Sequence, residues 1–103
     1  MGFQVGDLRD FCRKLLGFQG VTGVWLLSGP SDRDGLVYVT VAGFGGEEFH
    51  SNRMRVYGAV EDFLAERRDD MKESAFVFDY FVLADAPDLG EPGIPAGAER
   101  IAA

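Results

Sequence analysis

Apolar positions in the first part of the chain recur with helical spacing. Leucine, phenylalanine and cysteine side chains at positions 8, 11, 12, 15 and 16 share one face of a helix that the pattern predicts over residues 7–16. Asp7 is a suitable N-cap for this helix, and Gly17 is a suitable residue to end it. Cys12 lies within the apolar stripe, so we interpret it as a small buried hydrophobe and not as a reactive thiol.

Two short apolar runs follow and are separated by turn-forming residues. Residues 24–28 are typical of a buried strand, and residues 36–42 alternate valine with other side chains as a second strand does. The intervening residues 29–35 are rich in Gly, Ser and Asp, and they are too few for a helical crossover. The two strands are therefore predicted to form an antiparallel hairpin.

A longer helix is predicted over residues 47–68, after a glycine-rich connector at residues 43–46. Its apolar positions keep helical spacing at Phe49, Val56, Val60 and Phe63. Gly58, inside this helix, costs about 1 kcal/mol relative to alanine. We interpret this glycine as an allowance for close packing on the sheet.

The strongest strand signal lies at residues 75–83, which are apolar on both faces except for Asp79. Residues 69–73, just before it, are predicted to be a polar connection. After Ala84 the chain is rich in Pro, Gly and Ala and shows no sustained period. We interpret this part as an extended tail, in which Leu89, Ile94 and Ile101 are the residues able to anchor it.

The order of these elements, α-β-β-α-β, predicts an α+β fold. Residues 1–84 form one domain in this interpretation, and residues 85–103 form the tail. The simplest packing is a small three-stranded mixed sheet with both helices on one face. The other face then carries apolar side chains that the helices do not cover, so either the tail or a second copy of the chain has to cover it.

Charge and composition narrow the classes of partner. Seventeen acidic residues oppose ten basic ones, and a net charge of −7 repels nucleic acid. One cysteine and one histidine cannot supply the four ligands of a structural zinc site. No apolar run approaches the roughly 20 residues that span a bilayer, and the first residues lack a signal-peptide pattern. We therefore expect a cytoplasmic protein with no membrane partner.

Three aspartates form the constellation with the clearest chemistry. Asp32 and Asp34 follow the first predicted strand, and Asp79 lies in the third. An apolar strand ending in Gly and Ser, an Asp-x-Asp pair opening the next strand and a later third Asp form the signature of the small nucleotidyltransferase (DNA polymerase beta-like) superfamily. This region resembles that signature. The resemblance implies that the three aspartates are the catalytic residues and the ligands of two Mg²⁺ ions that bind a nucleoside triphosphate.

The same residues also have a structural interpretation. Ser28 precedes Gly29 where the family has Gly before Ser, and the helical turn that the family places before Asp-x-Asp is missing. Asp32 and Asp34 equally suit a hairpin turn in which their side chains cap the backbone, and this interpretation needs no cofactor. Asp79, within an apolar strand, needs a hydrogen-bond partner or water and is a candidate for a perturbed pKa.

Two further features have a structural interpretation. The glycines at residues 43–46 lie between a strand and a helix N-terminus, where phosphate binds in other proteins, but Glu47 and Glu48 would repel an anion there. We interpret this segment as a connector. His50 has no nucleophile near it in sequence and is predicted to be a surface residue.

Three functions are compatible with these patterns. The first is a non-enzymatic protein-interaction module, either a homodimer or the partner of another protein, and a catalytically inactive relic of a nucleotidyltransferase-like fold. The second is a minimal Mg-dependent nucleotidyltransferase-like protein that a partner completes. The third is a roadblock-like dimeric scaffold, whose order of elements is similar. We favour the first, because the sheet has an uncovered apolar face and the catalytic signature is incomplete.

Overall fold

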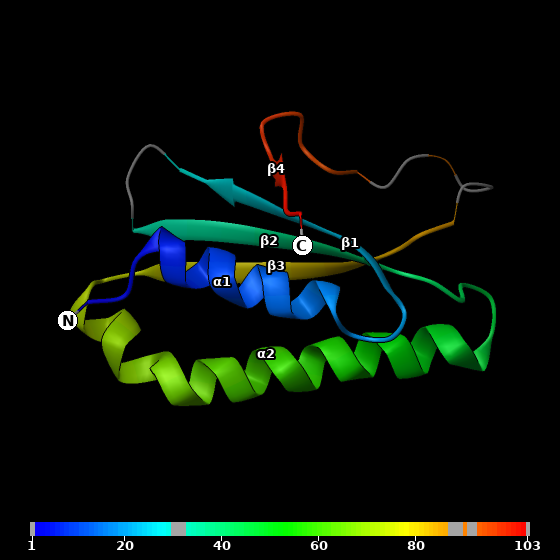
Figure 1. The fold of residues 1–103 in the computed structure, drawn as a ribbon, viewed down its shortest axis with the longest axis horizontal. Coiled ribbons are helices and arrows are strands. Elements are labelled where there is room, and N and C mark those ends of the chain that lie inside the picture. The colour runs from blue at the N-terminus through cyan, green and yellow to red at the C-terminus, as the bar shows by residue number, and fades with distance from the viewer. Residues whose placement is uncertain (1, 30–32, 87–89, 91–92, 103) are drawn as a thin grey trace.

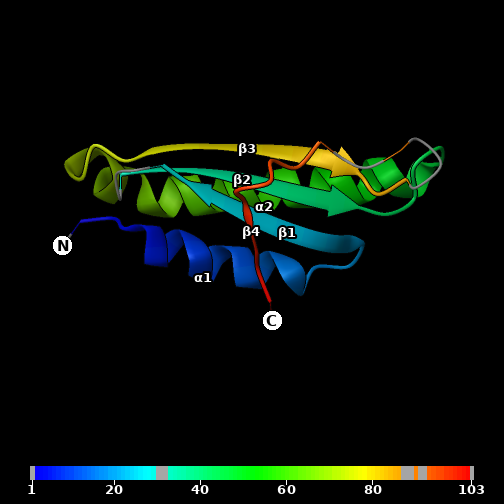
Figure 2. The same cartoon turned by 90° about the horizontal axis from the view of Figure 1, so that it is seen from above.

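The computed structural model describes residues 2–29, 33–86, 90 and 93–102. Its elements are α1 (Val5–Leu16), β1 (Val21–Ser28), β2 (Asp34–Val41), α2 (Glu47–Glu73), β3 (Val77–Ala84) and β4 (Glu99–Arg100). The strands form one mixed sheet in the order β3-β2-β1-β4. Both helices lie against the same face of this sheet (Figures 1 and 2). The predicted α+β class with two helices is confirmed.

The centre of the sheet is the predicted antiparallel hairpin. Trp25 of β1 lies opposite Tyr38 of β2, and Ser28 lies opposite Gly35 next to the turn. β3 joins the other side of β2 in parallel, because α2 carries the chain back to the end of the sheet where β2 begins. β2 therefore lies between an antiparallel neighbour and a parallel one.

The core lies between the helices and one face of the sheet. Alternate residues of β1 and β2 point toward the helices and are fully or almost fully buried: Val24, Leu26, Val37, Val39 and Val41. α1 lies over β1, and α2 lies over β2 and β3. From the helices, Leu8, Leu15, Val56 and Val60 complete this core. The periodic patterns in the sequence therefore identified the faces that become buried.

α1 begins two residues earlier than predicted. Its N-cap is Gln4, and Asp7 is the third residue of the helix, so the prediction of Asp7 as N-cap is wrong. The Asp7 carboxylate instead accepts the backbone N–H of Gln4 at 2.9 Å. Phe3, just before the cap, is buried in the core and holds this segment close to the sheet, which allows the helix to start there.

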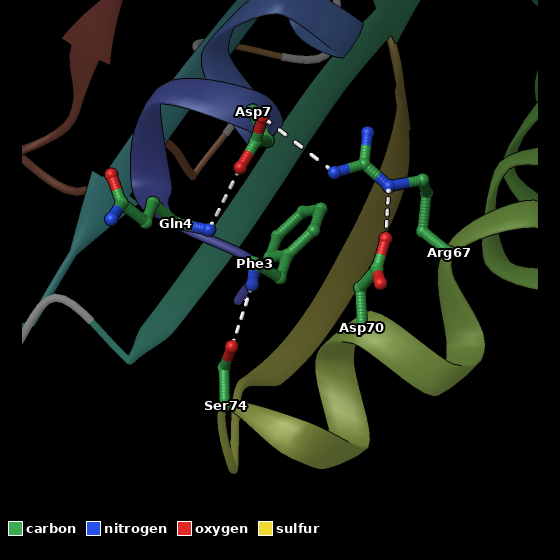
Figure 3. Close-up of polar contacts among 6 residues, drawn as sticks. All are labelled: Phe3, Gln4, Asp7, Arg67, Asp70 and Ser74. Atoms are coloured by element: carbon green, nitrogen blue, oxygen red, sulfur yellow. Dashed lines mark hydrogen bonds and ion pairs between the residues drawn. The ribbon is translucent and has the colours of Figure 1, made fainter. Parts of the chain in front are cut away.

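A set of polar contacts ties this N-terminal segment to the end of α2 (Figure 3). The backbone N–H of Phe3 donates to Ser74 Oγ at 2.6 Å. The Arg67 guanidinium lies 3.1 Å from the Asp70 carboxylate and 3.6 Å from that of Asp7. The same guanidinium stacks over the Phe3 ring. The start of α1 and the end of α2, which lie at the same end of the molecule (Figure 1), are therefore held together by these contacts.

α2 continues to Glu73, so the predicted polar connection at residues 69–73 is wrong. Met71 is only 7% exposed and lies seven residues after Leu64, which extends the apolar face of the helix by two turns. Arg67 and Asp70 form an ion pair across one turn in the same stretch. Between Leu64 and Met71, Glu66, Arg68 and Asp69 are exposed, and these charged residues obscured the apolar period in the sequence.

The tail contributes a fourth strand that the sequence did not predict. Glu99 and Arg100 pair with Leu26 and Trp25 on the outer edge of β1. Ile101 follows, donates its N–H to the carbonyl of Val24 at 2.9 Å and is 4% exposed. The predicted three-stranded sheet is therefore wrong, since a two-residue strand has no period that a pattern can detect. The second predicted anchor, Ile94, is half-buried, and Leu89 lies outside the described residues.

On its way to β1 the tail crosses the face of the sheet that the helices leave open (Figure 2). The Arg100 guanidinium lies 5.3 Å from the centre of the Trp25 ring. A methyl group added at Gly97 would lie 3.7 Å from Leu27. The tail thus covers part of the open face over β1 and β2, while Val77 and Phe81 on β3 stay exposed.

Replacing Gly58 tests how much backbone entropy a glycine inside α2 costs. It is exposed, and no atom beyond its own helix lies within 4 Å of the position a Cβ would occupy, so its interpretation as a close-packing residue is wrong. Gly58→Ala should raise the free energy of unfolding by about 0.5–1 kcal/mol, because alanine loses less backbone entropy. Urea denaturation followed by circular dichroism measures this change.

Gly43→Ala is the matched control for Gly58→Ala. Gly43 has a φ of 90°, and a Cβ there would lie 2.8 Å from the backbone nitrogen of Phe49. This variant should lose stability. A loss of stability in Gly58→Ala as well would contradict the account of α2.

Candidate functional site at the free edge of β3

The predicted catalytic aspartates are engaged by the backbone next to them. Asp34 opens β2, and its Oδ1 accepts the N–H of Gly29 at 2.8 Å. Asp79 lies in β3, and its Oδ1 accepts the N–H of Tyr80 at 2.8 Å. Asp32 lies outside the described residues. The contact of Asp34 is the one expected for a carboxylate that caps a hairpin turn.

Asp34 and Asp79 lie on neighbouring strands and on the same face of the sheet. Asp34 pairs with Val77, and Asp79 pairs with Leu36, so the two carboxylates are two register positions apart. In the part of the chain that the structure describes, no three His, Cys, Asp or Glu side chains are grouped so as to hold a metal ion.

β3 has one paired edge and one free edge. The N–H groups of Val77 and Asp85 donate to the carbonyls of Arg33 and Val41 in and next to β2. Because backbone groups alternate along a strand, the N–H groups of the even-numbered residues, Phe78 to Val82, point away from β2. Among the described strands none lies on that side, since β3 ends the sheet. Asp79 covers one of these free groups, the N–H of Tyr80.

Exposed apolar side chains accompany this free edge. Val77 is 67% exposed and Phe81 is 43% exposed, and both lie on the open face with Asp79 between them. Phe81 stacks on Tyr38 of β2, with ring centroids 5.3 Å apart. The edge thus combines unpaired backbone groups with apolar surface, which together favour the binding of another chain.

Cavities lie on both faces of the sheet at the start of β3. On the open face a cavity of about 280 Å³ is lined by Leu27, Gly29, Asp34, Gly35, Leu36 and Val77. On the helix face a cavity of about 480 Å³ is lined by Leu64, Arg68, Met71, Lys72, Ala75, Phe76 and Val77. Val77 borders both cavities. A strand added at this edge would direct alternate side chains toward these two spaces.

Charge is distributed unevenly along the edge. Arg68 and Lys72 are exposed near the start of β3 and form no ion pair with a described residue. Asp85, just after the end of β3, is exposed. Near the middle, burial and then Tyr57, Glu61 and Asp79 raise the pKa of the Tyr80 phenol above its usual value. The edge is therefore basic at one end and acidic from its middle to its other end.

Cys12 and His50 are the other two residues that the sequence analysis considered for a chemical role. Cys12 is fully buried, and burial raises the pKa of its thiol to about 12, so it behaves as the predicted small hydrophobe. His50 is exposed, as predicted, and its Nδ1 lies 3.2 Å from an Arg53 nitrogen. A cavity of about 470 Å³ next to the N-terminal segment is lined by residues that include Phe3 and Ser74, which bond each other.

The sequence identified Asp79 and the apolar faces of β3 but did not identify its edge position. A helix between β2 and β3 indicates parallel strands, but local pattern does not say which side of the hairpin the third strand joins. The basic pair Arg68 and Lys72 was also missed. Their helical spacing is visible in the sequence, but their position beside the start of β3 depends on where α2 ends.

Comparisons with known proteins do not assign this chain to a family. No family model, curated protein or solved structure matches this chain. Over the described residues, no helix is both long enough and apolar enough to cross a membrane.

The nucleotide interpretation of the aspartates can be tested by thermal unfolding. Millimolar Mg²⁺ with ATP or GTP should leave Tm unchanged, because Asp34 and Asp79 already accept backbone N–H groups. A ligand at about 100 times its Kd would add about 2.7 kcal/mol and shift Tm by several degrees. Asp69→Asn, on the exposed side of α2, is the control for Asp79→Asn. A rise above about 5 °C that Asp79→Asn alone abolishes would contradict this account.

Proposed function

We propose that this chain is a non-enzymatic protein-interaction module that associates with a second copy of itself through the free edge of β3. The proposal rests on one observation: β3 has the composition of a central strand and the position of an edge strand. Its side chains are apolar on both faces apart from Asp79. Parallel strands with this composition are normally covered on both faces.

Edge strands of stable monomers are usually protected against pairing. Short length, several charges, proline or a bulge are the common means. β3 has eight residues and contains one charged residue, Asp79, and no proline. An added strand would satisfy its outward N–H and C=O groups and cover Val77 and Phe81, which are the exposed apolar side chains on this strand.

The tail covers part of the open face over β1. In the dimer, side chains of the paired strand would flank the exposed residues of β3. Arg100 and Gly97 lie against β1, which leaves the β3 side of this face exposed. The net charge of −7 disfavours nucleic acid at this surface. In this proposal Asp34 caps the hairpin turn, and Asp79 accepts a hydrogen bond from a backbone N–H at the edge. Neither aspartate takes part in a reaction, and no cofactor is required.

Substitution at the edge tests this proposal. Wild-type protein at tens of micromolar should have twice the monomer mass of 11.3 kDa by light scattering. Val77→Lys and Phe81→Glu should be monomers, because each replaces an apolar side chain of the contact by a charge. Both positions are exposed, so circular dichroism should report an unchanged fold.

Met54→Lys is the matched control for these edge variants. Met54 is 50% exposed on α2, so its substitution also removes an exposed apolar side chain but leaves β3 intact. This variant should remain a dimer. A monomeric wild type over the whole concentration range, or equal dimerisation of all variants, would refute self-association through β3.

A further inference from the structure

We propose that the two copies pair β3 with β3 in antiparallel orientation, with Tyr80 at the two-fold axis and Val77 of each copy opposite Leu83 of the other. This inference rests on the proposed self-association and adds its register. The register follows from which backbone groups are free, from the position of Asp79 and from the residue that lies opposite Val77.

The direction of the backbone groups limits the possible registers. The outward N–H groups belong to even-numbered residues, since Val77 and Asp85 donate toward β2. In a symmetric antiparallel pair, outward residues of one copy must lie opposite outward residues of the other. The two registers with the longest overlap within β3 place Tyr80 or Phe81 opposite itself, and the next two place Asp79 or Val82 opposite itself. The last two pair fewer residues of the strand.

Electrostatics disfavours the register that centres on Asp79. It would place two carboxylates directly opposite each other, where like charges destabilise a strand pair. The register centred on Phe81 places the partner's Asp85 opposite Val77, which is the most exposed of the large apolar side chains in the described residues. Centring on Tyr80 instead places the partner's Leu83 opposite Val77. This register pairs two apolar side chains at each end of the contact.

Asp79 limits pairing at the edge. In the free chain its carboxylate accepts the N–H of Tyr80, the group that would donate to the partner's Tyr80 across the axis. Its side chain has to move before the strands pair. A charged side chain within an edge strand is a common defence against indiscriminate pairing. Asp79 thus disfavours the register in which it meets itself and weakens pairing with unrelated strands.

Disulfide cross-linking of mixed variants tests the register. Val77→Cys and Leu83→Cys are purified separately, mixed and oxidised at pH 8. A pair of opposite residues that share no hydrogen bond has Cα atoms about 4.5 Å apart, within disulfide reach. The mixture should give a covalent dimer on a non-reducing gel, and neither variant alone should do so. Cys12 needs no replacement, because it is fully buried and its thiol has a pKa of about 12.

Single-cysteine variants provide an independent check. Tyr80→Cys alone should cross-link, since this residue lies opposite itself in the proposed register, and this check does not depend on the folding of Leu83→Cys. Phe81→Cys and Asp79→Cys alone should not cross-link. Cross-linking of either, or equal cross-linking of single variants and mixture, overturns the register. A dimer by light scattering without any of the expected cross-links also overturns it, whereas a monomer overturns the proposed function itself.

Discussion

The parallel pairing of β3 with β2 is the constraint on which the rest of the structure depends. α2 runs the length of the sheet, so the chain re-enters beside the start of β2 and β3 must run parallel to it. β1 already occupies the other side of β2. β3 is therefore an edge strand despite its apolar composition. The tail, leaving the end of β3, has to cross the open face to reach the remaining edge at β1.

The part of the fold that depends on local pattern could be predicted from the sequence. The hairpin follows from two apolar runs with a short turn between them, and the helices follow from their apolar period. The end of α2 was missed because Met71 is a single buried residue among charged ones. β4 was missed because its position depends on Ile101 packing into the core, which is a tertiary contact with no local signal.

Asp79 and the apolar composition of β3 could be predicted from the sequence, but the position of the candidate site could not. Asp79 stands out in the sequence as a charge within an apolar run, and its hydrogen bond to the N–H of Tyr80 explains how the structure accommodates it. Its place on a free edge follows from the crossover of α2. The basic end at Arg68 and Lys72 follows from the extra turns of that helix. Both depend on tertiary structure that the composition of β3 does not specify.

Amide hydrogen exchange within β3 tests the central claim, self-association through its free edge, most directly. The N–H groups of Phe78 and Val82 point away from β2, while those of Asp79 and Phe81 point toward it. Phe78 and Val82 should be protected at concentrations where the protein is dimeric and should lose protection on dilution, whereas Asp79 and Phe81 stay protected throughout. Unprotected amides at Phe78 and Val82 in a dimeric sample would contradict the account.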